Sequence, residues 1–559
     1  MKQRKQQSFE YGAIILLCST MIVKLIGAIF KIPLSNLIGD LGFGYFSSAY
    51  DLFTPIYSLS MAGLPIAVSR LVAEQMASGN YRDVRQSLKV TKKAFFVTGF
   101  IGLVLMLLLI YPFVRLTDPT GKTVYSLFSI APSLLFCCVM STYRGYYEGL
   151  RNMYPTALSD IIEATGKLVL GLGFAYAVME LTENVALAAA GAMLGITVGA
   201  AAAALFLRLR YKLKGDMITE EELLGSPEAI SSRQTLKALI AIAVPVVVAS
   251  LANNIASLVD VSMVKWQLAR LMENSGDAVM QMYKASIADY NLTAKELLTA
   301  DAVPTFLYGI RGKAFTVYNL VPTITSVLGV SALPVLASSW VKRDKQLIKR
   351  NIDSMIKTTA LIAMPAGVGF FALGGPIMGL LYNSVASVEI GTPMMRIFGC
   401  AAFFAGLAIP MTSMLQAVGH QVAALRNVAI GAVLKIVVNF LLVAIPSVNI
   451  QGAAAGTFAC YLFVFVANLV TLIRVTKVKP SFKKVFLKPF IAAVACGISA
   501  YFVSLLGNSR FITIAAVGVA AVVYALFLIL LNTFEKEDVL ALPKGEKLLK
   551  LCLKLKIIR

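Results

Sequence analysis

Long apolar stretches separated by short polar segments run through almost the entire chain. The hydrocarbon core of a membrane, about 30 Å thick, is crossed by about 20 apolar residues in an α-helix. Stretches of this kind occur fourteen times, at residues 11–35, 45–75, 93–116, 124–148, 156–180, 184–208, 235–263, 314–339, 355–382, 392–418, 424–446, 450–474, 488–507 and 511–533. They are continuous and lack the polar/apolar alternation of β-barrel strands. The pattern predicts an all-α polytopic membrane protein with fourteen transmembrane helices.

The composition supports a membrane protein and excludes the soluble classes. Of the 559 residues, 58% are hydrophobic and 14% are charged, whereas soluble domains have about 45–50% and about 25%. The mean hydropathy is +0.77. A net charge of +22 would indicate a nucleic-acid partner in a soluble domain. In a membrane protein it is better explained by cytoplasmic loops, which are rich in Lys and Arg.

The distribution of basic residues predicts the orientation of the chain. Alternate loops are basic, namely those at 82–93, 208–214, 342–350 and 477–484. The short loops at 181–183, 383–390 and 446–449 contain no Lys or Arg. Because basic loops stay in the cytoplasm, we expect the N-terminus to be cytoplasmic. An even number of spans then returns the C-terminus to the same side.

Two pairs of similar segments predict an internal duplication. Gly63–Ser69 resembles Ala332–Ser338, and Lys167–Leu170 resembles Lys435–Val438, at offsets of 269 and 268 residues. Such repeats are typical of alternating-access transporters. Six spans separate the two halves, so the repeat would be parallel, a pseudo-twofold pair of six-helix lobes followed by two C-terminal helices. The predicted domains are an N-terminal lobe at 1–214, a cytoplasmic linker at 215–233, a C-terminal lobe at 234–476 with an extracellular loop at 265–308, helices 13 and 14 at 477–533, and a cytoplasmic tail at 534–559.

The predicted tail combines leucines with basic residues. Lys547, Lys550 and Lys554 recur at helical spacing opposite a leucine face. An amphipathic helix of this kind lies at the membrane surface and is attracted to anionic lipid.

Ionisable residues at membrane depth are the candidate functional groups, because burying them in lipid is costly. Our candidates for substrate binding in a central cavity are Lys24, Lys31, Asp51, Arg70, Asp260, Arg311 and Lys313. Lys24, near the middle of the first span, either lines the cavity or pairs with Asp260 or Asp51. Most of these groups are cationic, which favours anions and phosphates in particular.

Four further charges are candidates for coupling between the lobes. They are Glu163, Lys167, Arg396 and Lys435. Glu163 and Lys167 are four residues apart, a spacing that favours an ion pair along one helix face.

The chemistry of an enzyme is not evident in the sequence. There is no GxxxxGK[ST] phosphate-binding loop, and His420 is the sole histidine. No Ser/His/Asp constellation and no set of metal ligands is recognisable. We therefore expect no enzymatic activity, no metal site and no resident cofactor.

One stretch of sequence resembles a known family. The segment Tyr143–Gly149 (YRGYYEG), followed by Arg151–Ala157 (RNMYPTA) and Ile161–Glu163 (IIE), together with Gly63-Leu64-Pro65, resembles the stage V sporulation protein B/MurJ-like branch of the multidrug/oligosaccharidyl-lipid/polysaccharide (MOP) exporter superfamily. The resemblance covers essentially the whole chain. It implies two six-helix lobes around a cationic cavity, and a last pair of helices that forms a groove for a lipid tail.

The resemblance also implies a function in the bacterial plasma membrane. Such proteins flip polyprenyl-pyrophosphate-linked saccharides, for example lipid II, to the outer leaflet, in cell-wall synthesis or sporulation. Basic residues of the first, second and eighth helices bind the pyrophosphate. Lys24 matches the first position, with Lys in place of the usual Arg, while Arg311 and Lys313 lie near the eighth-helix position. Arg70 lies in the second helix but deeper than the family's arginines, and Asp51 resembles an acidic residue near the outer mouth.

The driving force and the alternatives stay open at this point. Coupling to Na⁺, to H⁺ or to the membrane potential could each drive transport. Cell-wall synthesis enzymes are candidate partners. A cation-coupled multidrug antiporter of the same superfamily is the main alternative, which Asp51 and Asp260 favour and Lys24 opposes. A non-transporting scaffold of a synthesis complex is the third.

Overall fold

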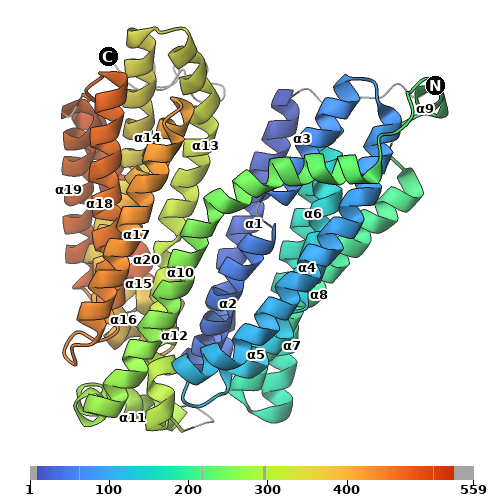
Figure 1. Cartoon of the computed structure of the whole chain (residues 1–559). Helices are drawn as coiled ribbons and strands as arrows, with labels where there is room; N and C mark the ends of the chain where they lie inside the picture. Colours follow the sequence, from blue (N-terminus) through green and yellow to red (C-terminus); the bar gives the residue numbers. More distant parts are fainter. Residues whose placement is uncertain are drawn as a thin grey trace. The chain divides into compact units, whose positions relative to one another are not determined.

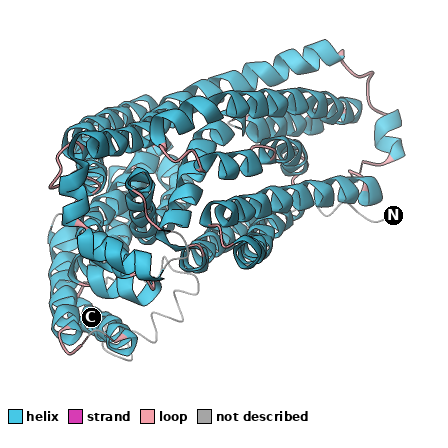
Figure 2. Cartoon of the chain, turned by 90° about the horizontal axis from the view of Figure 1, so that it is seen from below, coloured by secondary structure: helices cyan, strands magenta, loops and turns pink. Residues whose placement is uncertain are grey.

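A computed structural model of the chain consists of helices joined by short loops (Figure 1). It describes residues 9–61, 63–216, 218–293, 297–481, 483–507 and 509–533. Within these ranges every regular element is a helix and no strand occurs (Figure 2). The predicted all-α fold is confirmed. The predicted amphipathic tail at 534–559 lies outside the described residues.

The helices group into two compact units. The first comprises Met1–Met282 and Asn291–Gly309, and the second comprises Tyr283–Tyr290 and Ile310–Arg559. The boundary between the two lobes was expected in the linker at 215–233. The structure groups the helix after that linker, α10 (Ser232–Met282), with the first unit. The duplication into six-helix lobes stays a prediction.

The first unit contains most of the N-terminal half. Its other elements are α1 (Phe9–Leu37), α2 (Gly39–Met61), α3 (Leu64–Ala77), α4 (Tyr81–Thr117), α5 (Thr123–Ile130), α6 (Ser133–Gly149), α7 (Tyr154–Thr182), α8 (Val185–Lys214), α9 (Glu220–Leu224) and the 3₁₀ turn η1 (Ala300–Ala302). Helix α1 packs on α7, α7 on α8, α8 on α6, and α6 on both α3 and α4.

The second unit contains the remaining helices. They are α13 (Leu320–Val341), α14 (Lys345–Ala372), α15 (Gly374–Leu381), α16 (Val385–Ala417), α17 (Gln421–Val443), α18 (Gln451–Thr476), the π-helical turn η2 (Lys483–Leu487), α19 (Lys488–Ser504) and α20 (Arg510–Leu530). Two helices, α11 (Lys284–Thr293) and α12 (Val303–Tyr318), have residues in both units.

Thirteen helical segments in the described part of the chain are long and apolar enough to cross a membrane. The chain is therefore a multi-pass membrane protein. The predicted span at 235–263 lies within α10 and is not one of the thirteen. The exact count of fourteen stays a prediction.

The segment predicted as an extracellular loop, 265–308, is largely helical. Helix α10 continues through it to Met282, with one non-helical residue at Ser275, and is followed by α11, η1 and the start of α12. The predicted eighth span at 314–339 lies within a longer helical segment, which runs from Ala300 to Val341. Lys265 is 0% exposed, so this part of α10 is not a surface loop.

Glycines allow a close contact between α7 and α8 in the first unit. A Cβ atom on Gly195 of α8 would lie 2.3 Å from the Cα atom of Gly171 on α7, and one on Gly166 would lie 2.7 Å from the Cα atom of Gly199. A larger side chain at any of these positions would separate the two helices. Small residues commonly allow such close packing between membrane helices.

The second predicted span is divided by a turn. Gly63 has φ 75°, a left-handed conformation that favours glycine, and Pro65 lies in the first turn of α3. The similar segment around Pro334 has no such break, because α13 continues through this proline. The two matching segments therefore differ in backbone structure.

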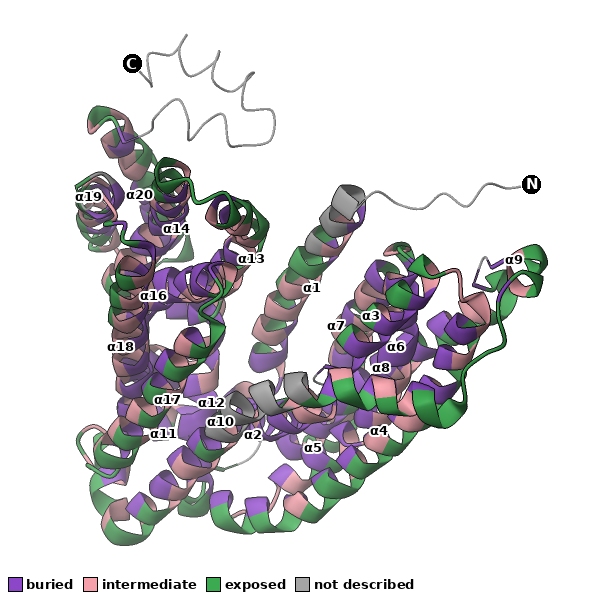
Figure 3. Ribbon diagram, turned by 45° about the horizontal axis from the view of Figure 1, so that its top comes forward, coloured by how far each residue is buried: buried purple, intermediate pink, exposed green. Residues whose placement is uncertain are grey.

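Apolar side chains on the outer surface are consistent with contact to lipid. Exposed residues follow one side of α4 (Figure 3), where Phe96, Phe100 and Leu108 are more than half exposed. In water such a surface would be unfavourable, but lipid tails are as apolar as these side chains.

A buried polar cluster joins α10 to α2. The Lys265 Nζ atom donates a hydrogen bond to Ser48 Oγ at 2.8 Å and lies 5.6 Å from the centre of the Tyr308 ring. Asp118, which follows α4, is 2% exposed and accepts a hydrogen bond from the Thr123 backbone at 2.9 Å. Burial alone would raise the pKa of Asp118, but the Lys265 charge and the Thr123 hydrogen bonds outweigh burial and lower it.

A second polar contact secures the segment after α8. Arg85 Nε donates to Asp216 Oδ2 at 2.9 Å, and the Tyr146 hydroxyl donates to the same oxygen at 3.1 Å. Burial would raise the pKa of Asp216, but the hydrogen bonds from Arg85 and from the Ile218 backbone lower it overall. The ionised form of Asp216 is thus favoured in the folded protein.

This contact predicts a pH-dependent contribution to stability. Asp216→Asn should lower the free energy of unfolding at pH 7 by about 1 kcal/mol, a small value because Arg85 is partly exposed. A depressed pKa gives stability that is complete above the unfolded value, about 3.9, and is lost as the pH falls through the folded value. The difference in unfolding temperature between the two proteins should therefore shrink as the pH falls below about 4. A difference that grows towards low pH would contradict this explanation.

Candidate functional site

A cavity of about 500 Å³ lies within the first unit. Its wall is formed by side chains of α1, α2, α6, α7 and α8. Five of the lining residues have basic or acidic side chains, namely Lys24, Arg144, Asp160, Glu163 and Lys167. The volume lies within the range of about 300–1,000 Å³ that is usual for ligand sites.

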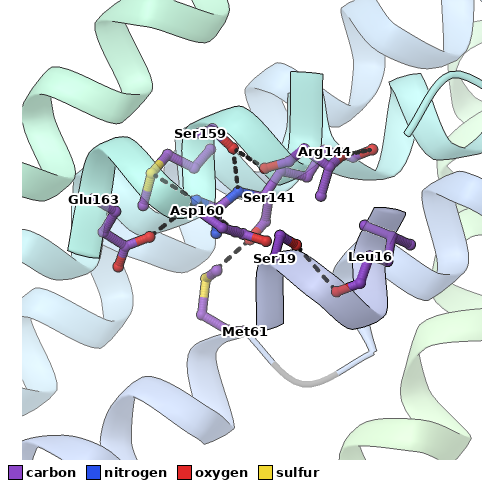
Figure 4. A network of polar contacts seen from close by, with 10 residues as sticks. Leu16, Ser19, Met61, Ser141, Arg144, Ser159, Asp160 and Glu163 are labelled. Carbon is purple, nitrogen blue, oxygen red and sulfur yellow. Dashed lines mark hydrogen bonds and ion pairs between the residues drawn. The ribbon is translucent and has the colours of Figure 1, made fainter. Parts of the chain in front are cut away.

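Arg144 forms the polar centre of this wall (Figure 4). Its guanidinium Nη2 atom lies 3.0 Å from Asp160 Oδ1 and 2.9 Å from Glu163 Oε2. Its Nε atom donates to Ser159 Oγ at 2.9 Å. The spacing on α7 makes this possible, because residues 160 and 163 are three apart and lie on one helix face. Arg144, from α6, therefore connects two helices through two ion pairs.

The two lysines of the lining give the cavity a small excess of positive charge. The lining contains three basic side chains, Lys24, Arg144 and Lys167, and two acidic ones, Asp160 and Glu163. One formal positive charge therefore remains. A site of this kind attracts anions more strongly than cations.

Tyr50 lies between two lysines of the first unit. Its ring centre lies 5.0 Å from Lys31 Nζ and 4.7 Å from Lys167 Nζ. Lys167 also lies 5.2 Å from the Phe30 ring centre. The π-face of an aromatic ring attracts cations, so the rings hold these ammonium groups beside the cavity.

The structure brings together only some of the predicted site residues. Lys24 lines the cavity, and Lys31 contacts Tyr50, which is also part of the lining. Asp51 accepts a hydrogen bond from the Tyr308 hydroxyl at 2.6 Å, and Asp260 is buried in α10. Neither carboxylate is part of the cavity lining.

Arg70 lies at the surface of α3. It forms an ion pair with Glu74 at 2.8 Å, and its side chain is 66% exposed. Arg70 is not part of the cavity lining either. The structure therefore does not bring this predicted site residue to Lys24.

Arg311 and Lys313 lie in the second unit, inside α12. Both are buried, at 4% and 1% exposure, whereas the sequence placed them at the outer mouth of a span. The Lys313 Nζ atom donates to Ser387 Oγ at 3.1 Å and lies 5.2 Å from the Tyr382 ring centre. Arg311 lies 5.4 Å from the Phe315 ring centre.

The four charges predicted for lobe coupling have different surroundings. Glu163 was expected to pair with Lys167, but it pairs with Arg144, and Lys167 contacts aromatic rings. Arg396 is exposed on α16, and Lys435 is partly buried on α17. Their role in coupling stays a prediction.

Two residues of the site were not among the predicted binding residues. Arg144 lies within the YRGYYEG segment, which served to recognise the family, and Asp160 follows in the next helix. The signal that could have identified them was present. An arginine inside an apolar span needs a carboxylate partner, and Asp160 and Glu163 are close in the sequence.

Metal ligands do not cluster in the described residues. No group of three or more His, Cys, Asp or Glu side chains there is arranged to hold a metal ion. A coupling ion, if one is used, stays a prediction.

Family models cover most of the chain. The model described as polysaccharide biosynthesis protein matches residues 11–295, which is half of the 559 residues. The chain belongs to this family. The model described as lipid II flippase MurJ matches residues 316–517. The predicted membership in the stage V sporulation protein B/MurJ-like branch of the MOP superfamily is confirmed.

Individual relatives agree with this family. Stage V sporulation protein B of Bacillus subtilis (strain 168) is 25% identical over 547 residues, which cover 96% of this chain and 98% of the relative. A structure of lipid II flippase MurJ in an inward closed conformation has a TM-score of 0.63 at 12% identity, and covers 92% of this chain and 98% of its own. An inward-facing multidrug resistance MATE family transporter of the MOP superfamily has a TM-score of 0.57 at 14% identity, with 82% and 98% covered. At these identities the structures show the fold.

Proposed function

We propose that this family member is a flippase that moves a polyprenyl-pyrophosphate-linked saccharide from the inner to the outer leaflet by alternating access. The observation that carries the proposal is the cavity of the first unit, where Lys24 and Lys167 leave a net positive charge. Lys binds phosphate groups as a point charge. The names of the relatives, stage V sporulation protein B and lipid II flippase MurJ, support a lipid-linked precursor as the substrate.

The cavity favours an anionic headgroup over a drug cation. Its two carboxylates, Asp160 and Glu163, are both engaged by Arg144. A cation would have to compete with this arginine for them, while a pyrophosphate would gain the attraction of Lys24 and Lys167. The uncharged polyprenyl tail would stay in the lipid, where it needs no protein partner.

The membrane potential can supply the driving force in the proposed cycle. With both termini in the cytoplasm of a bacterial cell, the headgroup enters from a compartment that is electrically negative. Moving one charge across 100 mV changes the free energy by about 2.3 kcal/mol. A pyrophosphate exported without counter-ions would gain about twice this amount. The proposed cycle therefore needs neither ATP nor enzymatic chemistry, and coupling to Na⁺ or H⁺ would add to the potential.

The second candidate is a cation-coupled multidrug antiporter, and the observation that favours it is the similarity in fold to the MATE transporter. That similarity covers the fold alone and does not explain the excess of positive charge. A scaffold without transport activity would not need a charged cavity.

Thermal protection of the purified protein in detergent tests the three functions. We expect undecaprenyl pyrophosphate at 100 times its Kd to stabilise the protein by about 2.7 kcal/mol, seen as a higher unfolding temperature. Undecaprenol, which has the same tail and no phosphate, is the matched control and should have little effect. Protection by tetraphenylphosphonium and not by the pyrophosphate lipid would favour the antiporter. Protection by neither would favour the scaffold.

A further inference from the structure

A second cavity, of about 450 Å³, adjoins the first one. The two share four lining residues, namely Thr20, Tyr57, Arg144 and Asp160. The shared residues come from α1, α2, α6 and α7, so the same helices continue from one cavity into the other. A ligand longer than either cavity could therefore occupy both.

The two cavities differ in chemistry. The first is lined by Lys24 and Lys167, whereas the described residues that line the second include no lysine. The second cavity adds the carboxylate of Glu148 and the hydroxyls of Ser58, Ser141 and Thr156. Arg144 borders both, but its guanidinium already contacts Asp160, Glu163 and Ser159. The second cavity thus offers mainly hydrogen-bond acceptors and hydroxyls.

One of these hydroxyls makes only a weak contact within the protein. The Ser141 hydroxyl donates to the Met61 sulfur at 3.5 Å, and a thioether is a weak acceptor. The Thr156 hydroxyl, by contrast, forms a side-chain hydrogen bond with Glu148. The Ser141 side chain is buried, at 2% exposure. A ligand could replace its contact with a stronger one at little cost.

We propose that the second cavity binds the saccharide part of the headgroup, and that it selects sugars which are neutral or carry an amine. This inference rests on the proposed function, in which Lys24 and Lys167 hold the pyrophosphate. Sugar hydroxyls donate to carboxylates such as Glu148, and they both donate to and accept from serine and threonine. Tyr57 adds an aromatic surface at the junction of the two cavities, which suits the apolar face of a sugar ring.

The arrangement also predicts which headgroups are excluded. A uronic acid or a phosphate-bearing sugar would place a further acidic group beside Glu148 and Asp160. Acidic groups at such close range repel each other when they are ionised. The first cavity favours negative charge and the second disfavours it. A headgroup whose negative charge is confined to the pyrophosphate therefore fits both cavities.

Binding measurements with two lipids test the inference. One is undecaprenyl pyrophosphate, and the other is the same lipid carrying a neutral N-acetylhexosamine disaccharide. We expect the sugar-bearing lipid to bind the full-length protein more tightly. Glu148→Gln should raise the Kd of the sugar-bearing lipid about tenfold, the loss of one strong hydrogen bond, and leave the Kd of the sugar-free lipid unchanged. A lipid with a uronic acid should gain affinity in this variant.

Matched variants keep the test decisive. Glu180→Gln removes an exposed carboxylate from α7 and should change neither Kd. If Glu148→Gln does not fold, Ser58→Ala removes only a half-buried hydroxyl and should weaken the sugar-bearing lipid selectively, by about threefold.

Three results would overturn the inference. Equal affinity of the unmodified protein for both lipids would remove the saccharide site and leave the proposed function standing. An equal loss of affinity for both lipids in Glu148→Gln would show that Glu148 supports the structure of the protein and does not contact the sugar. Failure of both lipids to bind would overturn the proposed function together with the inference.

Discussion

Replacing Lys24 with alanine should slow flipping of an undecaprenyl-pyrophosphate-linked saccharide in proteoliposomes about tenfold or more. Lys24 lines the cavity of the first unit and supplies one of its positive charges. A charge-assisted hydrogen bond contributes about 1.5–3 kcal/mol, which corresponds to a factor of about ten to one hundred. The rate can be measured from the accessibility of a labelled headgroup to an impermeant reagent outside the vesicle.

Two variants separate the role of this charge from general damage. Lys24→Arg keeps the charge and should retain most of the rate. Lys212→Ala removes an exposed positive charge from α8 of the same unit and should leave the rate unchanged. An unimpaired Lys24→Ala protein would mean that the headgroup does not depend on this lysine, and the proposed binding mode would be wrong.

Replacing Arg144 with alanine should have the largest effect on stability. It would leave Asp160 and Glu163 without the guanidinium that lies 3.0 Å and 2.9 Å from their oxygens. Removing one partner from a buried ion pair costs about 3–5 kcal/mol, because the remaining charge stays buried. The side chain borders a cavity, so the lower end of this range is expected. The unfolding temperature of the purified protein in detergent should fall accordingly.

The explanation by unpaired carboxylates can be checked by removing them. A triple variant with Arg144→Met, Asp160→Asn and Glu163→Gln should regain much of the lost stability, because no uncompensated charge is left. Arg144→Lys should be intermediate, since an ammonium cannot form the same fork of hydrogen bonds. If the triple variant is less stable than Arg144→Ala, the ion pairs do not explain the stability of this region.

The sequence was sufficient to predict the class of fold and most of the helical spans. Apolar stretches of about 20 residues leave few alternatives to membrane helices. Residues 45–75 were expected to form one span, although glycine and proline, at positions 63 and 65, are residue types that commonly interrupt helices. The periodic apolar residues of the segment 265–308 indicated short surface helices, but they did not indicate that α10 continues as one helix through residues 265–282.

The partners of the charged residues were harder to predict. The spacing of Glu163 and Lys167 favoured an ion pair within one helix, but Arg144 on another helix pairs with Glu163. Arg70 was a candidate for the cavity because it lies in the second predicted span, yet it is exposed and pairs with Glu74. Depth in the membrane can be estimated from position along a span. The direction in which a side chain points around the helix axis depends on packing. In a helix that is apolar on all sides, the periodicity of the sequence does not show which side is buried.

The buried ammonium of Lys265 restricts how α10 can move. Its contact with Ser48 of α2 and its attraction to Asp118 compensate for the cost of keeping a full charge away from water. A rotation of α10 about its own axis would move that charge away from both groups and lose both interactions. Axial rotation of this helix is therefore unfavourable as an elementary step of any transport cycle, and α10 has to bend or to travel together with α2.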